Sequence, residues 1–172
     1  MSAASYSAVE LLRHGRRVEI RALTPDDRAD FLAAVDRSSP RSLYRRFFSV
    51  RQEFAEQEVD FFVNVDFVNH AALVAVMEEA GRPVIVGAGR YIVVGPGRAE
   101  VAFAVVDAYQ GQGVGAALMR HLAVVAQNAG LKELVADVLP DNLPMLKVFE
   151  KSGLDVRTQR GLRVVQVTLR LT

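Results

Sequence analysis

The sequence contains no cysteine among its 172 residues, which excludes disulfide bonds, thiolate catalysis and thiolate metal ligands. Its three histidines, His14, His70 and His121, lie far apart at spacings that match no common metal motif, so we expect no bound metal. No apolar run approaches the roughly 18 residues that a membrane helix needs. The N-terminal segment places its arginines after its apolar residues, the reverse of a signal peptide. We therefore expect a cytoplasmic protein without membrane contact.

Neither sign of charge dominates, because 21 lysines and arginines face 20 acidic residues, a formal net charge of +1. This balance argues against nucleic acid as a partner. About half of the residues are apolar, 51%, and a chain of this length buries a substantial core. We expect a flexible tail over 1–15, with a weak helical patch over 9–12, and a single domain over 16–172. Both a monomer and a homodimer remain open.

Hydrophobic periodicity predicts a mixed order of strands and helices. The expected strands cover 17–23, 70–79, 83–94, 99–106 and 133–139, with two more on either side of Arg160 and Gly161. The expected helices begin after the N-cap Thr24, cover 39–49, 54–63 and 112–127, and run from Asn142 to Gly153. Strands that pair as a meander and then alternate with helices predict an α/β (α+β) fold built on a mixed sheet.

The loop between the strand 99–106 and the helix 112–127 contains three glycines in the stretch QGQGVG, residues 110–115. A tight turn that needs a positive φ requires only one glycine, and Gly115, inside the expected first helical turn, costs about 1 kcal/mol relative to alanine. Removing Cβ atoms lets main-chain amides and the positive end of the helix dipole approach an anion. We interpret the loop as a phosphate site rather than a turn alone.

Two other phosphate-binding loops fit this stretch less well. Gly111, Gly113 and Ala116 match a dinucleotide fingerprint, but the residues DAYQ separate them from the preceding strand. Only about sixty residues follow, too few for the second half of a dinucleotide domain. A P-loop is excluded because no lysine followed by serine or threonine closes the glycine run.

The stretch QGQGVG resembles the Q/R-x-x-G-x-G/A loop of the GNAT superfamily of N-acetyltransferases. A second segment, Asp141 and Asn142 followed by FEKSGL over 149–154, resembles the N-x(6)-Y-E-K-x-G-F segment of that family, with Phe149 in place of the tyrosine. The stretches SLYRRFFS, VDFVNHAALVAV and DVLPDN are similar to the catalytic domains of bacterial Pat-type protein lysine acetyltransferases. The resemblance covers roughly 17–171.

This resemblance implies a GNAT fold, a mostly antiparallel sheet of about six to seven strands flanked by helices. It implies acetyl-CoA as co-substrate and a bulge near residues 104–106 that frees backbone groups for it. The implied cofactor contacts are Ala104, Val105, Val106, Gln110, Gly111, Gln112, Gly113, Val114, Gly115, Ala116, Asn142 and Phe149. Asn142 is also a good helix N-cap, and Phe149 cannot protonate a departing thiolate as tyrosine does in many family members.

Glu100 is the candidate general base. An amine of the lysine type has a reference pKa of about 10.4, so it arrives protonated at neutral pH and must lose a proton. Strand alternation places Glu100 on one face with Ala102 and Ala104, and apolar surroundings favour proton acceptance by a carboxylate. The resemblance agrees, since many family members carry a catalytic glutamate on this strand. The alternative interpretation is a solvated glutamate at a strand end.

The acceptor side is expected in the segment SPRSLYRRFFS, where Arg41, Tyr44 and Arg45 are candidate substrate contacts. The alternative is a solvated face of an amphipathic helix. We expect transfer of an acetyl group from acetyl-CoA to a primary amine, a protein lysine according to the resemblance, by direct attack assisted by a base. A small-molecule amine acetyltransferase and a non-catalytic acyl-CoA-binding sensor remain alternatives.

Overall fold

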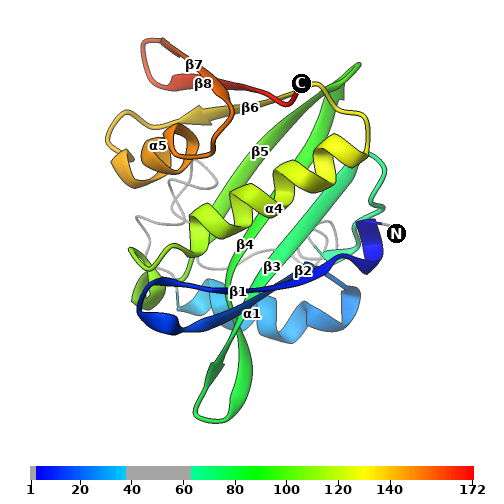
Figure 1. Cartoon of the computed structure of the whole chain (residues 1–172), viewed down its shortest axis with the longest axis vertical. Coiled ribbons are helices and arrows are strands. Elements are labelled where there is room, and N and C mark those ends of the chain that lie inside the picture. The colour runs from blue at the N-terminus through cyan, green and yellow to red at the C-terminus, as the bar shows by residue number, and fades with distance from the viewer. Residues whose placement is uncertain (1–2, 38–62) are drawn as a thin grey trace.

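The computed structural model describes residues 3–37 and 63–172 (Figure 1). Its strands are β1 (Ser7–Leu11), β2 (Arg17–Ala22), β3 (His70–Glu79), β4 (Arg82–Gly95), β5 (Arg98–Val105), β6 (Glu133–Val138), β7 (Asp155–Arg160) and β8 (Val165–Arg170). Its α-helices are α1 (Arg28–Asp36), α4 (Val114–Asn128) and α5 (Leu143–Glu150). Short 3₁₀ turns cover Ala3–Ser5, Arg13–Gly15, Pro25–Asp27 and Asp107–Tyr109.

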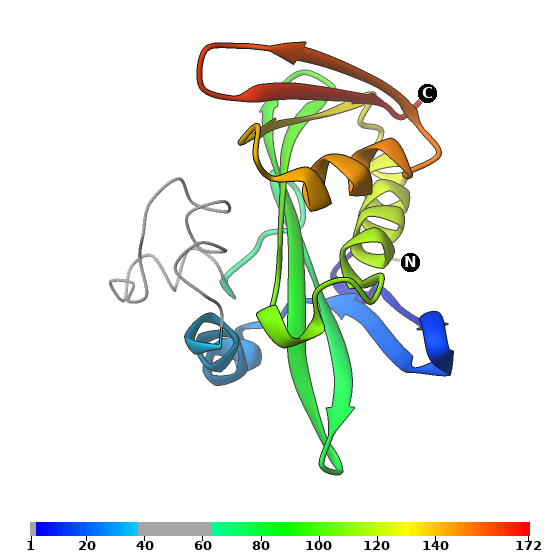
Figure 2. The same ribbon diagram turned by 90° about the vertical axis from the view of Figure 1, so that its left-hand side faces the viewer.

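In the described part of the chain the strands form one eight-stranded sheet in the order β1-β2-β3-β4-β5-β6-β8-β7. The pairing of β5 with β6 is parallel and every other pairing given for this sheet is antiparallel. Helices α4 and α5 cover one face, whereas α1 lies on the other (Figure 2). The prediction of a mixed, mostly antiparallel sheet flanked by helices is confirmed, with one strand more than the expected maximum.

The additional strand is β1, so the helical patch expected over 9–12 is wrong. Residues 7–11 pair with β2 from Ser7↔Arg21 to Leu11↔Arg17, so this part of the chain is not the loosely held tail that we expected. Ser7, Val9 and Leu11 are exposed and Ala8 and Glu10 are half-buried. This alternation is the period of a half-buried strand, but the apolar Val9 and Leu11 lie on the exposed side and Glu10 on the inner side, so hydrophobicity does not mark the buried face.

The main core lies between the sheet and α4. The buried face of α4 contributes Ala117, Leu118, Leu122 and Ala126, all with side chains at 0% exposure, at the 3.6-residue spacing of an amphipathic helix. A smaller cluster forms on the opposite face of β3 and β4, around Leu23, Val74 and Ile85. The helices expected over 39–49 and 54–63 lie outside the described residues, except for Val63.

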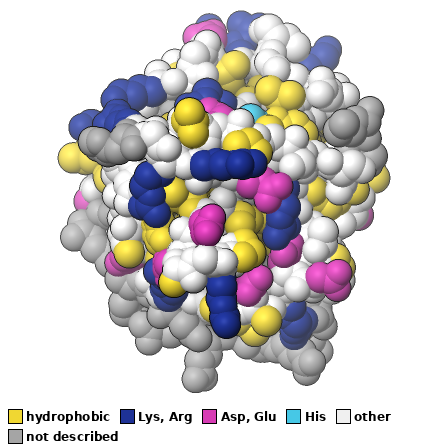
Figure 3. Space-filling view, turned by 60° about the horizontal axis from the view of Figure 1, so that its bottom comes forward, with side chains coloured by type: hydrophobic (Ala, Val, Ile, Leu, Met, Phe, Trp, Pro, Cys, Tyr) yellow, Lys and Arg dark blue, Asp and Glu magenta, His cyan; other side chains and the backbone are white. Residues whose placement is uncertain are grey.

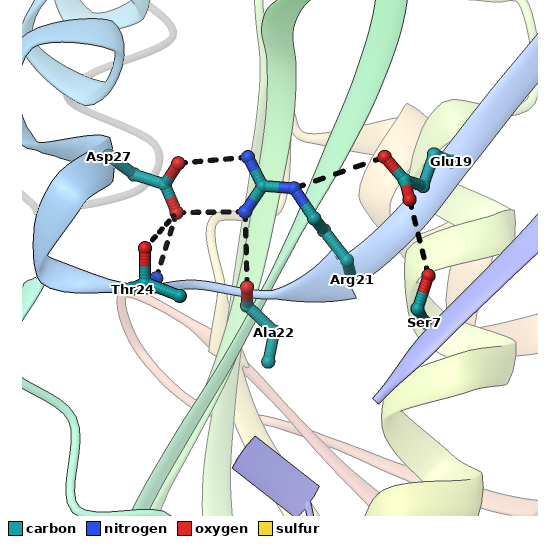
Figure 4. A network of polar contacts seen from close by, with 6 residues as sticks. All are labelled: Ser7, Glu19, Arg21, Ala22, Thr24 and Asp27. Carbon is teal, nitrogen blue, oxygen red and sulfur yellow. Dashed lines mark hydrogen bonds and ion pairs between the residues drawn. The ribbon is translucent and has the colours of Figure 1, made fainter. Parts of the chain in front are cut away.

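The connection from β2 into α1 is fixed by an ion pair between Arg21 and Asp27 (Figure 4). The guanidinium donates to both carboxylate oxygens at 2.9 and 2.8 Å, and the Thr24 amide donates to the same carboxylate at 2.8 Å. Burial alone would raise the pKa of Asp27, but the hydrogen bonds from Arg21 and Thr24 hold it below its ordinary value.

Candidate functional site

The glycine loop joins the end of β5 to the start of α4. Gly111 and Gly113 have φ angles of +81° and +95°, a region that favours glycine. Gly113 is the N-cap of α4, and no side chain caps this helix. The first amides of a helix have no acceptor within the helix, so those of Val114, Gly115 and Ala116 are presented at the positive end of the helix dipole.

Packing does not require glycine at position 115. A Cβ atom there would lie 3.4 Å from Cγ2 of Val148 on α5 and 3.8 Å from Cγ2 of Val105 on β5, which are ordinary van der Waals distances. The interpretation that the missing side chain serves the approach of a phosphate stays a prediction.

Beside the loop, β5 and β6 separate. Their parallel pairing begins at Arg98↔Glu133 and ends at Glu100↔Val135, although β5 continues to Val105 and β6 to Val138. The two strands diverge beyond that point (Figure 1). Backbone groups of a strand alternate between its two edges. Because the Val106 amide donates to Val86 on β4, the groups of Ala104 face β4 as well, and those of Val105 face the opening at its loop end.

The expected bulge near 104–106 is wrong. The register of β5 with β4 runs without a shift from Gly87↔Val105 to Val93↔Ala99, and the irregularity falls between Val93 and Gly95. The separation of β5 from β6 supplies the free backbone groups instead. The Val106 amide is not one of these free groups, because it donates to the Val86 carbonyl at 2.8 Å. Contact of Val106 with a cofactor stays a prediction.

Gln110 and Gln112 hold the loop in place. The Gln110 side-chain amide donates to the Val105 carbonyl at 3.1 Å, and that of Gln112 to the Ala108 carbonyl at 3.4 Å. Arg16, in the connection between β1 and β2, donates to the Gln112 amide oxygen at 3.0 Å. Sequence reasoning missed Arg16 because 96 positions separate the two residues.

Glu100 lies on the face that the alternation predicts. Ala99, Val101 and Phe103 are buried and belong to the core under α4, whereas Glu100 points to the opposite face and is exposed. The apolar enclosure that we expected around its carboxylate is therefore not found among the described residues. An exposed carboxylate can still accept a proton from a substrate amine that lies against it.

A buried arginine–histidine pair shares this face. Ile92 pairs with both His70 and Glu100, so these three residues form one row across β3, β4 and β5. In the next row Arg90 donates to Nε2 of His70 at 2.8 Å, and the two side chains are 4% and 7% exposed. The sequence analysis missed this pair. Arg90 and Ile92 lie two positions apart on one strand, so their side chains share a face, and this spacing could have indicated that Arg90 lies there.

Asn142 is the N-cap of α5, as its alternative interpretation predicts, and accepts a hydrogen bond from the Met145 amide at 3.4 Å. Phe149 is a core residue at 1% exposure, and its ring packs edge-on against Phe103 with 6.0 Å between centroids. Contact of either residue with a cofactor stays a prediction. Arg41, Tyr44 and Arg45 lie outside the described residues.

The described ranges contain no group of three or more histidine, aspartate or glutamate side chains placed to hold a metal ion. No helix in them combines the length and apolar character that crossing a membrane requires.

The structure places a glycine loop between a strand and a helix, next to two diverging strands. This arrangement indicates the class of protein, and comparison with known proteins agrees with it. Residues 38–154 match the model of the Acetyltransferase (GNAT) family. The chain belongs to this family.

Individual relatives also support membership of this family. The chain is 34% identical to Acetyltransferase Pat of Mycolicibacterium smegmatis over 157 residues, 91% of this chain and 47% of that protein. It therefore spans about half the length of this relative. It is 35% identical to Acetyltransferase PA5475 of Pseudomonas aeruginosa over 127 residues, 73% of this chain and 68% of that protein. The crystal structure of the GNAT domain of S. lividans PAT superposes with a TM-score of 0.86 at 33% identity, over 95% of this chain and 96% of that one.

Proposed function

We propose that this chain transfers an acetyl group from acetyl-CoA to a primary amine, and that the acceptor is a protein lysine. The observation that carries the proposal is the run of uncapped amides at the start of α4, next to the opening between β5 and β6. The similarity to Acetyltransferase Pat, at 34% identity, supports the activity, and the resemblance of the sequence to Pat-type protein lysine acetyltransferases supports the acceptor.

The diphosphate of acetyl-CoA fits the loop. Gly111 and Gly113 leave the backbone uncovered, and no side chain competes for the first amides of α4. The edge of β5 that faces the opening offers the Val105 amide to the pantetheine arm, since the Val105 carbonyl already accepts from Gln110. Contact of Ala104 with this arm stays a prediction. When bound, acetyl-CoA supplies an activated thioester, so the protein needs no nucleophile of its own.

In this proposal Glu100 removes a proton from the acceptor ammonium group. The neutral amine then attacks the thioester carbonyl carbon, the new C–N bond forms and the C–S bond breaks. The thiol, with a reference pKa of about 8.5, leaves as a thiolate without a protein acid, and the proton that the acylated nitrogen loses passes to this thiolate or to water. The buried Phe149 is consistent with this, since it has no proton to give.

The test compares Glu100→Gln with Glu133→Gln, a matched change on the adjacent strand, where Glu133 pairs with Arg98 at 3.1 Å. We expect Glu100→Gln to bind acetyl-CoA within about twofold of the parent and to lose about 100-fold in kcat with a lysine peptide. Glu133→Gln should keep its kcat. Unchanged thiol release by Glu100→Gln would remove this residue from the mechanism.

The acceptor class needs its own experiment. Labelled acetyl-CoA is incubated with the protein and a cell lysate, and mass spectrometry locates the label. Label on lysine side chains supports the proposal, whereas label confined to small amines supports the small-molecule alternative. Binding of acetyl-CoA without any transfer would favour an acyl-CoA sensor.

A further inference from the structure

Tyr109, the last residue of the 3₁₀ turn before the glycine loop, joins segments that are distant in sequence. Its hydroxyl donates to Glu79 at the end of β3, 2.6 Å away. Glu79 also accepts from Arg37, after α1, at 3.0 Å. The guanidinium groups of Arg16 and Arg37 lie 5.2 and 5.8 Å from the centre of the Tyr109 ring. Two cations thus meet at one aromatic ring beside the loop.

The two arginines differ in how their charge is balanced. Arg37 forms an ion pair with Glu79, whose pKa is held below its ordinary value by hydrogen bonds from Tyr109 and Arg37, with a smaller effect from the charge of Arg16. Arg16 donates its hydrogen bond to the neutral amide of Gln112. Within the described ranges no ion pair joins Arg16 to a carboxylate, so this cluster keeps an excess positive charge.

Arg16 is also exposed and held in position. Its side chain is open to solvent, and the Gln112 hydrogen bond and the Tyr109 ring fix the guanidinium against the loop. One hydrogen bond uses one of the five N–H donors of an arginine, and the remaining donors suit the oxygens of a phosphate. Figure 3, which shows the end of the molecule that carries the β3–β4 hairpin, displays basic side chains interleaved with acidic ones. The described side chains on this face form no continuous basic patch.

We propose that Arg16 binds a phosphate group of coenzyme A, from an element outside the residues that match the family model. That match begins at residue 38, whereas Arg16 lies in the connection between β1 and β2. This inference rests on the proposed function, since it takes the glycine loop as the site of the diphosphate. The phosphate that Arg16 contacts is either that diphosphate or the 3′-phosphate of the ribose.

The test measures the Kd for coenzyme A by isothermal titration calorimetry, without any acetyl transfer. Arg16→Gln removes the guanidinium, and Arg13→Gln removes an equal charge from the same exposed turn. We expect Arg16→Gln to raise the Kd about tenfold, as the loss of a charge-assisted hydrogen bond does, and Arg13→Gln to change it less than about twofold. Arg16→Lys, which keeps the charge but loses the planar fork, should fall between the parent and Arg16→Gln.

A second titration with 3′-dephospho-coenzyme A identifies the phosphate. If Arg16 binds the 3′-phosphate, the parent and Arg16→Gln bind this ligand equally; if it binds the diphosphate, the tenfold difference remains. Both results support the proposal. Equal Kd values of the parent and Arg16→Gln for coenzyme A would overturn it, and so would an equal loss in Arg13→Gln. A parent protein that binds no coenzyme A would instead overturn the proposed function, and unliganded thermal melting confirms that the variants fold.

Discussion

Two tyrosine hydroxyl groups, each on a buried residue, lie in opposite surroundings. Tyr91 on β4 is 1% exposed, and its hydroxyl is buried without a hydrogen-bond partner within the described ranges. Burial raises the pKa of Tyr91, with a smaller contribution from the charge of Asp66. Tyr109 is also buried, but its hydroxyl reaches Glu79. An unpaired buried hydroxyl destabilises the folded state, whereas a paired one does not.

We therefore expect Tyr91→Phe to increase the free energy of unfolding by about 1 kcal/mol. The change removes a hydroxyl group that bonds to water in the unfolded chain and is unpaired in the folded one. Tyr109→Phe is the matched control, and it should decrease the free energy of unfolding because Glu79 loses a donor. Urea unfolding followed by circular dichroism measures both. A Tyr91→Phe variant less stable than the parent would show that its hydroxyl has a partner.

At the scale of elements, two glycines of β4 let α4 and β5 pack closely against it. Gly89 pairs with Phe103 of β5, and a Cβ atom on Gly89 would lie 2.6 Å from Cδ1 of that ring. A Cβ atom on Gly87 would lie 3.0 Å from Val114 and 3.2 Å from Leu118, both on α4. The ring of Phe103 in turn supports Phe149 on α5. The position of both helices thus depends on residues 87–89 of β4, a stretch with little side-chain volume.

Gly89→Ala is accordingly expected to lower the free energy of unfolding by about 1 to 3 kcal/mol, because the ring of Phe103 must move in a packed core. Gly95→Ala, on the same strand, meets nothing within 4 Å and should stay within about 0.5 kcal/mol of the parent. Chemical denaturation of the two variants measures both changes in the free energy of unfolding. Equal stability of both would mean that Phe103 relaxes without cost.

The elements that hold the site follow from local patterns, and the contacts between them do not. The alternation in β5 and the apolar stripe of α4 are local signals, and the elements predicted from them agree with the structure. Glycines 111 and 113 adopt positive φ angles, and the phosphate site that we inferred from them stays a prediction. The pairing of β1 with β2 was missed because the apolar residues of β1, Val9 and Leu11, lie on its exposed side, so the hydrophobic pattern does not mark a buried face. The partnership of Arg16 with Gln112 joins positions 96 apart, and no pattern within a window of residues contains it.

At the scale of the whole molecule, the Glu10 carboxylate ties the N-terminal strand β1 to the helix α4. Glu10 on β1 accepts from Arg120 on α4 at 2.6 Å and also contacts His121, which contacts Tyr6. Burial alone would raise the pKa of Glu10, but the hydrogen bonds with Arg120 and His121 lower it. The pKa of Asp27 is lowered by Arg21 in the same way. Both carboxylates are therefore more acidic in the folded chain than in the unfolded one.

A lowered folded-state pKa stabilises the protein above the unfolded-state value, and this stability is lost as the pH falls through the folded-state value. The free energy of unfolding should thus decrease as the pH falls below about 5. Asp27→Asn should lower it by about 1 to 2 kcal/mol at pH 7 and make it less dependent on pH. Asp26→Asn, a change at the exposed neighbour, should alter it by less than about 0.5 kcal/mol at pH 7. Urea titrations at a series of pH values between 3 and 7 measure these slopes. If the Asp27→Asn curve ran parallel to that of the parent at every pH, the pair with Arg21 would carry none of the acid sensitivity.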